Sequence, residues 1–297
     1  MIPNTNDGST QAPRLRRYIS MFAVQSMPAY AKNTPAENVA LIHEAGYEGI
    51  QFGDGDAQET IDGCLKLGMG VAQSGRISVP ADADALASRL AGEGVECATI
   101  HLGWGTEDEI EGARLIEALL SASSKHRLPL YAETHRATLF QDMWRTVQFV
   151  KRFPELRFNA DFSHWYTGAE MVYGGVDSKL ALIAPVFARV RFMHGRISDP
   201  GCMQVCVDTS KTQAFVEDFK RMWATAFAGF LQSAVAGDYI CFAPELLAND
   251  IFYGRMVPSN GGMVEECDRW QQSFVLTEIA QQCFAKAQAE QDAVPTA

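Results

Sequence analysis

Short apolar runs that end in polar side chains recur along this chain and alternate with segments whose apolar residues recur every three or four positions. The first pattern is typical of buried strands and the second of helices that lie on a sheet. The last helix, expected over residues 264 to 288, carries such a stripe, made of Leu276, Ile279, Ala280, Cys283 and Phe284. Eight strands are predicted, at residues 17–24, 47–53, 69–74, 95–102, 128–133, 157–161, 190–195 and 239–245.

Residues that begin and end helices separate these elements. Three expected helices end in a glycine, which adopts the left-handed conformation without steric cost, and these are Gly46, Gly68 and Gly94. Three segments have the spacing of a capping box at a helix start, namely Thr34–Glu37, Thr106–Glu109 and Thr138–Gln141. Strands and helices that alternate in this way predict an α/β fold, a single (β/α)8 TIM barrel with parallel strands and an active site at its C-terminal mouth.

The composition fits one such domain. The chain has 297 residues, 47% hydrophobic and 21% charged, and α/β barrels of this length commonly form one domain. We expect the barrel over residues 16 to 290, a flexible N-terminal tail over 1 to 15 and a flexible C-terminal tail over 291 to 297. The first 15 residues lack the apolar core of a secretory signal, and no apolar run approaches the ~20 residues of a membrane span.

Charge and cysteine content limit the partners and the location that we expect. The 36 acidic residues outnumber the 25 basic ones, and the net charge of −11 repels a phosphate backbone, so we expect no nucleic acid partner. The seven cysteines form no CxxC pair, which favours reduced thiols in a cytoplasmic protein.

The ends of the last four predicted strands carry side chains that bind metals. Glu133, Asp161, His194 and Glu245 each stand where an apolar run ends. The first three are about 30 residues apart, the length of a βα repeat, and the last interval leaves room for an insertion. Because the C-terminal ends of barrel strands meet at one mouth, these four residues are predicted to form a mononuclear metal site. Three carboxylates and one imidazole suit Mn²⁺ or Mg²⁺, tolerate Co²⁺ or Zn²⁺, and lack the thiolates of a structural zinc site.

Other side chains near strand ends are candidates for substrate contacts. Besides His194, three of the six histidines stand at or just past a strand end, and these are His101, His135 and His164. Trp104 and Trp165 also follow strand ends, and aromatic faces suit the C–H faces of sugars. The alternative for each residue alone is structural, as a satisfied imidazole or an aromatic ring that fills the barrel mouth.

Two charged residues have structural alternatives of their own. Arg196 follows His194 closely, and its alternative is a salt bridge to Asp199 in the same loop. Glu133 has the alternative of closing a charge network within the barrel.

The order of these residues resembles the xylose isomerase-like TIM barrel family of sugar isomerases and epimerases, above all the ketose 3-epimerases. The shared pattern over residues 16 to 288 is a Glu, an Asp-x-x-His, a His followed by an Arg, and a final Glu, here Glu133, Asp161, His164, His194, Arg196 and Glu245. The resemblance implies that the quartet binds one divalent cation, Mn²⁺ first, with no organic cofactor. It also implies that His164 and Arg196 contact substrate oxygens, and that the protein is a homodimer or homotetramer acting on a small carbohydrate.

The function that the resemblance implies is a metal-dependent sugar isomerase or epimerase. Glu133 and Glu245 would exchange a proton next to the carbonyl of a ketose, through an enediolate that the cation stabilises. One alternative is a lyase or dehydratase on a keto-sugar or keto-glycoside, in which the enolate expels a β-substituent. Another is an apurinic endonuclease-type hydrolase, which needs a basic surface and a histidine where this chain has Gln73-Ser-Gly-Arg76. A non-catalytic binding module is the last, and two intact glutamates argue against it.

Several features depart from the pattern of the ketose epimerases. Arg196 lies closer to His194 than the corresponding arginine does in those enzymes, and the second strand ends in Gln51 rather than an acid. The run Glu133–Arg136 and residues 197–209 are typical of a subgroup. The identity of the substrate therefore stays open.

Overall fold

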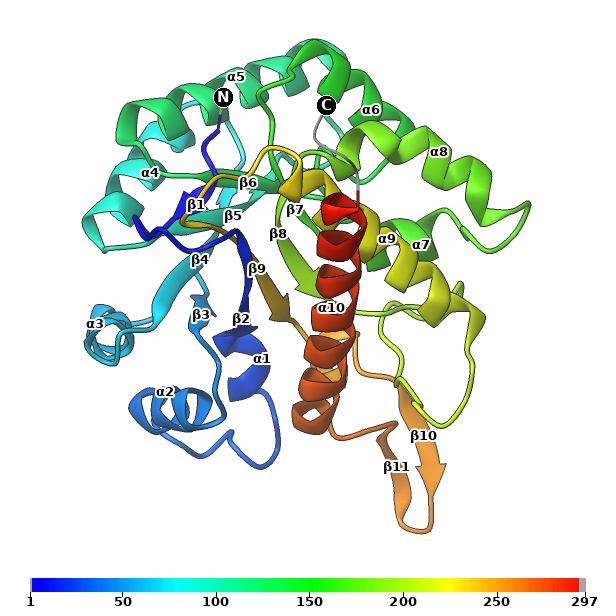
Figure 1. Cartoon of the computed structure of the whole chain (residues 1–297). Helices are drawn as coiled ribbons and strands as arrows, with labels where there is room; N and C mark the ends of the chain where they lie inside the picture. Colours follow the sequence, from blue (N-terminus) through cyan, green and yellow to red (C-terminus); the bar gives the residue numbers. More distant parts are fainter. Residues whose placement is uncertain (1, 294–297) are drawn as a thin grey trace.

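Eight parallel strands form a closed barrel in the computed structural model, which describes residues 2 to 293 (Figure 1). Each strand pairs in parallel with the next, and β9 pairs with both β8 and β2, which closes the ring. The predicted TIM barrel is confirmed. Its strands are β2 (Arg14–Ser20), β3 (Gly49–Phe52), β4 (Gly70–Ile77), β5 (Cys97–Leu102), β6 (Leu130–Glu133), β7 (Phe158–Ala160), β8 (Val190–Gly195) and β9 (Asp238–Pro244).

Helices follow the strands and surround the barrel (Figure 1). They are α1 (Met21–Gln25), α2 (Pro35–Glu44), α3 (Gln58–Lys66), α4 (Asp82–Gly92), α5 (Glu109–His126), α6 (Met143–Arg152), α7 (Phe162–Gly168), α8 (Val176–Phe187), α9 (Ala214–Leu231) and α10 (Arg269–Asp292). The connection after β9 carries a 3₁₀ turn, η1 (Asn249–Ile251), and a hairpin of β10 (Met256–Ser259) and β11 (Gly262–Glu265) that extends away from the body.

Several element boundaries differ from the sequence prediction for local reasons. The first strand ends at Ser20, whose side chain accepts a hydrogen bond from Ala23 and caps α1, so residues 21–24 are not strand. The expected capping box at Thr34 is present. The expected starts at Thr106 and Thr138 are wrong, because Asp108 caps α5 and Asp142 caps α6. Residues 264–268 precede the last helix, which begins at Arg269.

Parts of the segment expected as a flexible tail over residues 1 to 15 pack against the barrel, and Arg14 and Leu15 already belong to β2. Ile2 and Thr5 are each 2% exposed, and Thr5 donates a hydrogen bond to the Tyr239 carbonyl. The short strand β1 (Thr5–Asn6) pairs antiparallel with β9. Of the C-terminal tail expected over residues 291 to 297, the first two residues continue α10, and residues 294 to 297 lie outside the described part of the chain.

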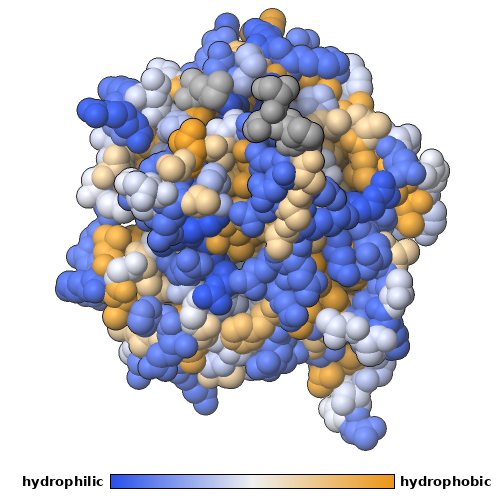
Figure 2. All heavy atoms as spheres, viewed as in Figure 1, coloured by the Kyte–Doolittle hydropathy of each residue, from blue (hydrophilic) through white to orange (hydrophobic). Residues whose placement is uncertain are grey.

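The side of the molecule drawn in Figure 2 is mainly hydrophilic, with hydrophobic residues scattered singly or in small groups. Scattered exposed apolar residues are ordinary on a folded protein. Within residues 2 to 293, no helix combines the length and the apolar character that crossing a membrane requires.

Tyr18 fills the end of the barrel where the strands begin. Its fully buried ring lies against Gly49 and Gly70, the first residues of β3 and β4, and its hydroxyl donates to Glu96 Oε2 at 2.5 Å. A Cβ at either glycine would overlap Tyr18, so the missing side chains make room for the ring. This end is therefore closed by packing, and the strand ends at the opposite mouth are left to form a site.

Gly70→Ala is expected to lower the free energy of unfolding by about 1–3 kcal/mol, because the added methyl group overpacks the closed end of the barrel. Chemical denaturation measures the change. Gly63→Ala is the matched control. Its Cβ would meet nothing within 4 Å in the middle of α3, and the higher helix propensity of alanine should stabilise the protein by about 1 kcal/mol. Equal effects at the two positions would contradict the packing argument.

Candidate metal centre

The four predicted metal ligands come together at the mouth of the barrel. Glu133 ends β6, Asp161 directly follows β7, His194 lies in β8 and Glu245 directly follows β9. One ligand atom of each lies within 4.8 Å of those of the others. His194 Nδ1 is 3.3 Å from Glu133 Oε1, 3.5 Å from Glu245 Oε2 and 4.0 Å from Asp161 Oδ2. Residues far apart in sequence therefore surround one small volume.

The buried position of the cluster fits a cation. The side chains of Glu133, Asp161 and His194 are at most 2% exposed, and that of Glu245 is 18% exposed. Glu133 Oε1 is buried and has no hydrogen-bond partner in the described part of the chain. A buried carboxylate oxygen without a partner is costly, and a divalent cation with oxygen preference is a partner that this donor set fits.

Gln51 orients the imidazole of His194. Its amide oxygen lies 2.9 Å from His194 Nε2, and its amide nitrogen donates to Thr99 Oγ1 at 2.7 Å. Since an amide oxygen only accepts, Nε2 carries a proton and Nδ1 is the atom that faces the carboxylates. A hydrogen bond to the far nitrogen is how metal-binding histidines are usually held in position.

The charges inside the cluster stabilise one another. Burial opposes the charged form of His194, but the carboxylates of Glu245 and Glu133 outweigh burial and raise its pKa to about 9. Burial likewise raises the pKa of Glu133, but His194 and His101 lower it well below the ordinary value. For Asp161, burial is outweighed by Arg196 and His164, and the pKa is lowered. Both carboxyl groups are therefore ionised at neutral pH, the form that binds metals.

Arg196 joins two of the candidate ligands rather than pairing with Asp199. The fully buried guanidinium donates from Nη1 to Asp161 Oδ2 at 2.5 Å and from Nη2 to Glu245 Oε2 at 2.6 Å. Asp199 Oδ2 instead lies 3.5 Å from Arg255 Nη1, so the predicted alternative of a loop salt bridge is wrong. Arg196 also lies under the ring of Tyr253, with Cζ 4.6 Å from the ring centroid. Its position holds the two carboxylates in place.

Three histidines stack beside the cluster. The ring centroids of His101 and His135 are 4.3 Å apart, and those of His135 and His164 are 3.9 Å apart. His164 Nε2 lies 3.4 Å from Asp161 Oδ2, and neither ring nitrogen makes a hydrogen bond within residues 2 to 293. Burial and the neighbouring His164 lower the pKa of His135 to about 3, so this imidazole is neutral. The three predicted substrate contacts are thus grouped at one side of the quartet.

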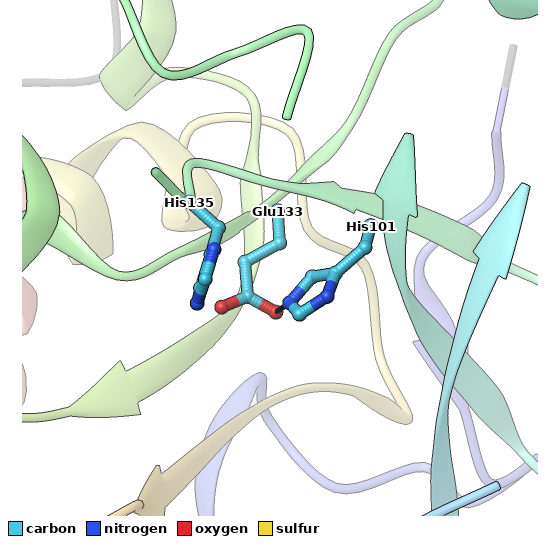
Figure 3. Close-up of side chains that lie close together, drawn as sticks. All are labelled: His101, Glu133 and His135. Carbon is cyan, nitrogen blue, oxygen red and sulfur yellow. Dashed lines mark ion pairs between the residues drawn. The ribbon is translucent and has the colours of Figure 1, made fainter. Parts of the chain in front are cut away.

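The Glu133 carboxylate lies between the imidazoles of His101 and His135 (Figure 3). These three residues have metal-binding atoms within 4.8 Å of one another, yet their hydrogen bonds argue against a second ion. Arg76 Nη2 lies 3.2 Å from His101 Nδ1 and can only donate, so the proton of His101 is on Nε2, 3.3 Å from Glu133 Oε2. His101 therefore serves Glu133 as a hydrogen-bond donor.

The two predicted tryptophans have different surroundings. Trp104 is 54% exposed, and its ring lies over Arg76, with the guanidinium carbon 3.9 Å from the centroid. Trp165 is 1% exposed, donates from Nε1 to the Phe140 carbonyl and packs on Phe162. The structure does not bring Trp165 into the cluster, and its surroundings give it a packing role.

Sequence reasoning did not assign a role to three residues that contact the site, Gln51, Arg76 and Tyr253. Gln51 and Arg76 are the last but one residues of β3 and β4, and Tyr253 lies in the connection after β9. Tyr253 Oη lies 3.3 Å from His135 Nε2, and the guanidinium carbons of Arg196 and Arg136 lie 4.6 Å and 4.7 Å from its ring centroid. Without the folded arrangement, an amide, an arginine and a tyrosine at strand ends are not distinctive.

Comparison with known proteins identifies the fold. No protein-family model matches the sequence, and no curated protein matches it. Solved structures share the architecture, and one is a probable 3-DHS dehydratase from Bacillus anthracis, with a TM-score of 0.57 and 14% sequence identity over 88% of this chain and 98% of that one. A 3-keto-D-glucoside 4-epimerase from E. coli has a TM-score of 0.53 and 10% identity, over 89% of this chain and 98% of that one. A xylose isomerase-like TIM barrel protein from Mycobacterium smegmatis, in complex with magnesium, has a TM-score of 0.54 and 13% identity, over 93% of this chain and 98% of that one. The chain therefore has the xylose isomerase-like barrel fold.

Addition of Mn²⁺ is expected to stabilise the protein. At a free concentration about 100 times the dissociation constant, binding to the folded state alone adds about 2.7 kcal/mol to the free energy of unfolding. Glu133→Gln should remove most of this gain, because it deletes a ligand charge, whereas Glu217→Gln on the exposed surface of α9 should keep it. Thermal unfolding with and without Mn²⁺ measures the effect. Equal stabilisation of both variants would show that the ion binds elsewhere.

Gln51→Met is expected to weaken Mn²⁺ binding by about 10- to 100-fold, because His194 loses the hydrogen bond that orients its ring. Isothermal titration calorimetry measures the affinity. Gln73→Met on the neighbouring strand is the control, since the amide of Gln73 bonds to the Gly53 carbonyl and not to His194. An unchanged affinity in Gln51→Met would contradict the orienting role.

Proposed function

We propose that this protein is a divalent-metal-dependent isomerase or epimerase that acts on a keto-sugar. The observation that carries the proposal is the convergence of Glu133, Asp161, His194 and Glu245 within 4.8 Å at the mouth of the barrel. Barrel enzymes carry out their chemistry at this mouth. The similarity in fold to a 3-keto-D-glucoside 4-epimerase is consistent with such a reaction.

The quartet would hold one divalent cation, with Mn²⁺ as the first choice for a donor set of three carboxylates and one imidazole. Once bound, the cation supplies a Lewis acid that draws electrons from a substrate carbonyl and makes the neighbouring C–H bond acidic. His194 presents Nδ1 to this space because Gln51 holds its other nitrogen. Arg196 keeps Asp161 and Glu245 in position and offsets part of their negative charge.

Glu133 and Glu245 are the groups that move protons. They reach the same volume from β6 and β9, strands three places apart around the barrel, and so approach a bound substrate from different sides. One carboxylate takes the proton next to the carbonyl, and the electrons of the broken C–H bond form the C=C bond of an enediolate. The other carboxylate returns a proton to the opposite face, which inverts the carbon centre. Two placed carboxylates are what this two-sided transfer needs.

A lyase or dehydratase is the second candidate, and the stacked histidines favour it. After the same proton removal, the electrons of the enolate can expel an oxygen substituent on the adjacent carbon, which then needs a proton. His164 lies beside Asp161 and has both ring nitrogens free of hydrogen bonds in the described chain, so a ring N–H is available to the leaving oxygen. The two candidates share the first step and differ in the product.

Proton exchange with D₂O tests the shared step. Mn²⁺-loaded protein incubated with a panel of ketoses and keto-glycosides is expected to incorporate deuterium next to the carbonyl, observed by NMR. Glu133→Gln and Glu245→Gln should each slow exchange by about 10²–10⁴-fold, because each removes an acid/base group. Glu217→Gln, on the outer surface, is the matched control and should exchange at the normal rate.

The products separate the candidates. A retained carbon skeleton with deuterium at one stereocentre identifies an isomerase or epimerase, and loss of a substituent identifies a lyase. Absence of exchange with every member of the panel, in protein shown by calorimetry to contain the cation, would overturn the proposed function.

A further inference from the structure

Arg76 is a half-buried cation beside the metal centre, and no acidic side chain forms a salt bridge with it within residues 2 to 293. It stands near the end of β4, directly opposite His101 in the register of β4 and β5. Its Nη1 donates to the Gly103 carbonyl at 2.6 Å, and its Nη2 donates to His101 Nδ1 at 3.2 Å. Within residues 2 to 293, no carboxylate oxygen lies within 4.0 Å of its guanidinium nitrogens. Three of its five N–H groups remain available.

The surroundings of Arg76 keep its guanidinium in a fixed place. One face lies on the ring of Trp104, with Cζ 3.9 Å from the centroid. The Trp104 backbone N–H donates to Glu107 Oε1 at 2.6 Å, which holds the loop that carries the ring. Aromatic stacking and two hydrogen bonds leave the guanidinium edge as the part that can meet a ligand.

The charges of the metal centre balance without Arg76. Glu133, Asp161 and Glu245 carry three negative charges, and Arg196 and a divalent cation carry three positive ones. Glu107 is a further acid whose charge acts on Arg76, and its two carboxylate oxygens accept backbone N–H groups from Trp104 and Gly105. Neither Glu133 nor Glu107 forms a direct salt bridge with Arg76, so a ligand would not have to displace one to reach the guanidinium.

A second cation lies on the same rim. Arg136, next to His135 in the chain, is exposed and lies over the Tyr253 ring, with Cζ 4.7 Å from the centroid. Its guanidinium also has no carboxylate within 4.0 Å in the part of the chain that the structure describes. Arg76, beside His101, and Arg136, next to His135, thus place two positive charges along the stacked histidines, where the proposed substrate would lie.

We propose that the substrate of this site is an acidic keto-sugar, whose carboxylate is bound by Arg76 while its carbonyl end faces Glu133 and Glu245. The inference rests on the proposed function and adds the class of substrate. Arg76 is separated from Glu133 by a single residue, His101, to which both are joined, so one sugar-sized molecule reaches both groups. The planar fork of an arginine matches two carboxylate oxygens, a geometry that a neutral hydroxymethyl group cannot use.

A matched set of ketoses tests the inference. D-Fructose, its derivative with a carboxylate at C6, and its 6-phosphate differ only in the group far from the carbonyl. With Mn²⁺-loaded wild-type protein, deuterium exchange should show a KM for the carboxylate about 10- to 100-fold lower than for the neutral ketose, since hydrogen bonds to charged groups are the strong ones. Arg76→Gln should remove this ratio, and Arg76→Lys should keep only part of it because the fork is lost.

Arg114→Gln is the control for loss of a positive charge. Arg114 is exposed on α5, outside the barrel mouth, and this variant should keep the wild-type ratio. Circular dichroism and Mn²⁺ affinity of each variant show that the fold and metal centre are intact. The KM for the neutral ketose and the KM for the carboxylate are compared within each variant, so a change in overall activity alone does not alter their ratio.

The outcomes separate this inference from the proposed function. Exchange on the neutral ketose with no preference for the carboxylate, or a preference that survives in Arg76→Gln, would overturn the acidic substrate and leave the enolising function standing. A preference for the 6-phosphate over the carboxylate would also overturn the carboxylate assignment. Lack of exchange with all three sugars and with the wider panel would overturn the proposed function, and this inference with it.

Discussion

Electrostatic repulsion among three carboxylates, two of them buried and one partly buried, is the constraint on which the mouth of this barrel depends. Glu133, Asp161 and Glu245 converge within 4.8 Å, and like charges at this separation in a poorly hydrated space are unfavourable unless positive charge lies among them. Arg196 supplies a fixed positive charge, and His194, whose pKa is raised to about 9, supplies another in the absence of a cation. In the proposed function, a divalent cation would take the place of the proton on His194 Nδ1, and its two charges together with that of Arg196 would balance the three carboxylates.

The architecture and the quartet were predictable because both depend on local sequence. An apolar run that ends in a polar side chain marks a strand end, and a closed parallel barrel brings all strand ends to one rim whatever the helices look like. Strand alternation does not extend to His135, because β6 ends at Glu133 and the histidine is placed by the loop that follows. Helix starts were less predictable where two residues that can cap a helix stand close together. Before α5, Thr106 and Asp108 are both candidates, and Asp108 is the cap.

Other parts of the site depend on tertiary contacts that no local pattern records. The partner of Arg196 is set by how β7 and β9 lie beside β8, and not by the nearby Asp199. Trp165 is buried against Phe140 and Phe162, so its place after a strand end was misleading. Thr5 and Asn6 pair with β9 because that strand has a free edge at its first residues. In each case the deciding neighbour is distant in sequence.

The acidic composition of the chain does not exclude an anionic substrate. The net charge of −11 acts over the whole surface, and at physiological ionic strength its influence falls off over about 8 Å. A ligand in the mouth is governed by the charges that lie within that distance and are shielded from water. With the proposed cation bound, its charge and that of Arg196 would balance the three carboxylates, and Arg76 and Arg136 would add positive charge beside them. A negative net charge over the whole chain is thus compatible with the proposed binding of a small carboxylate at the mouth.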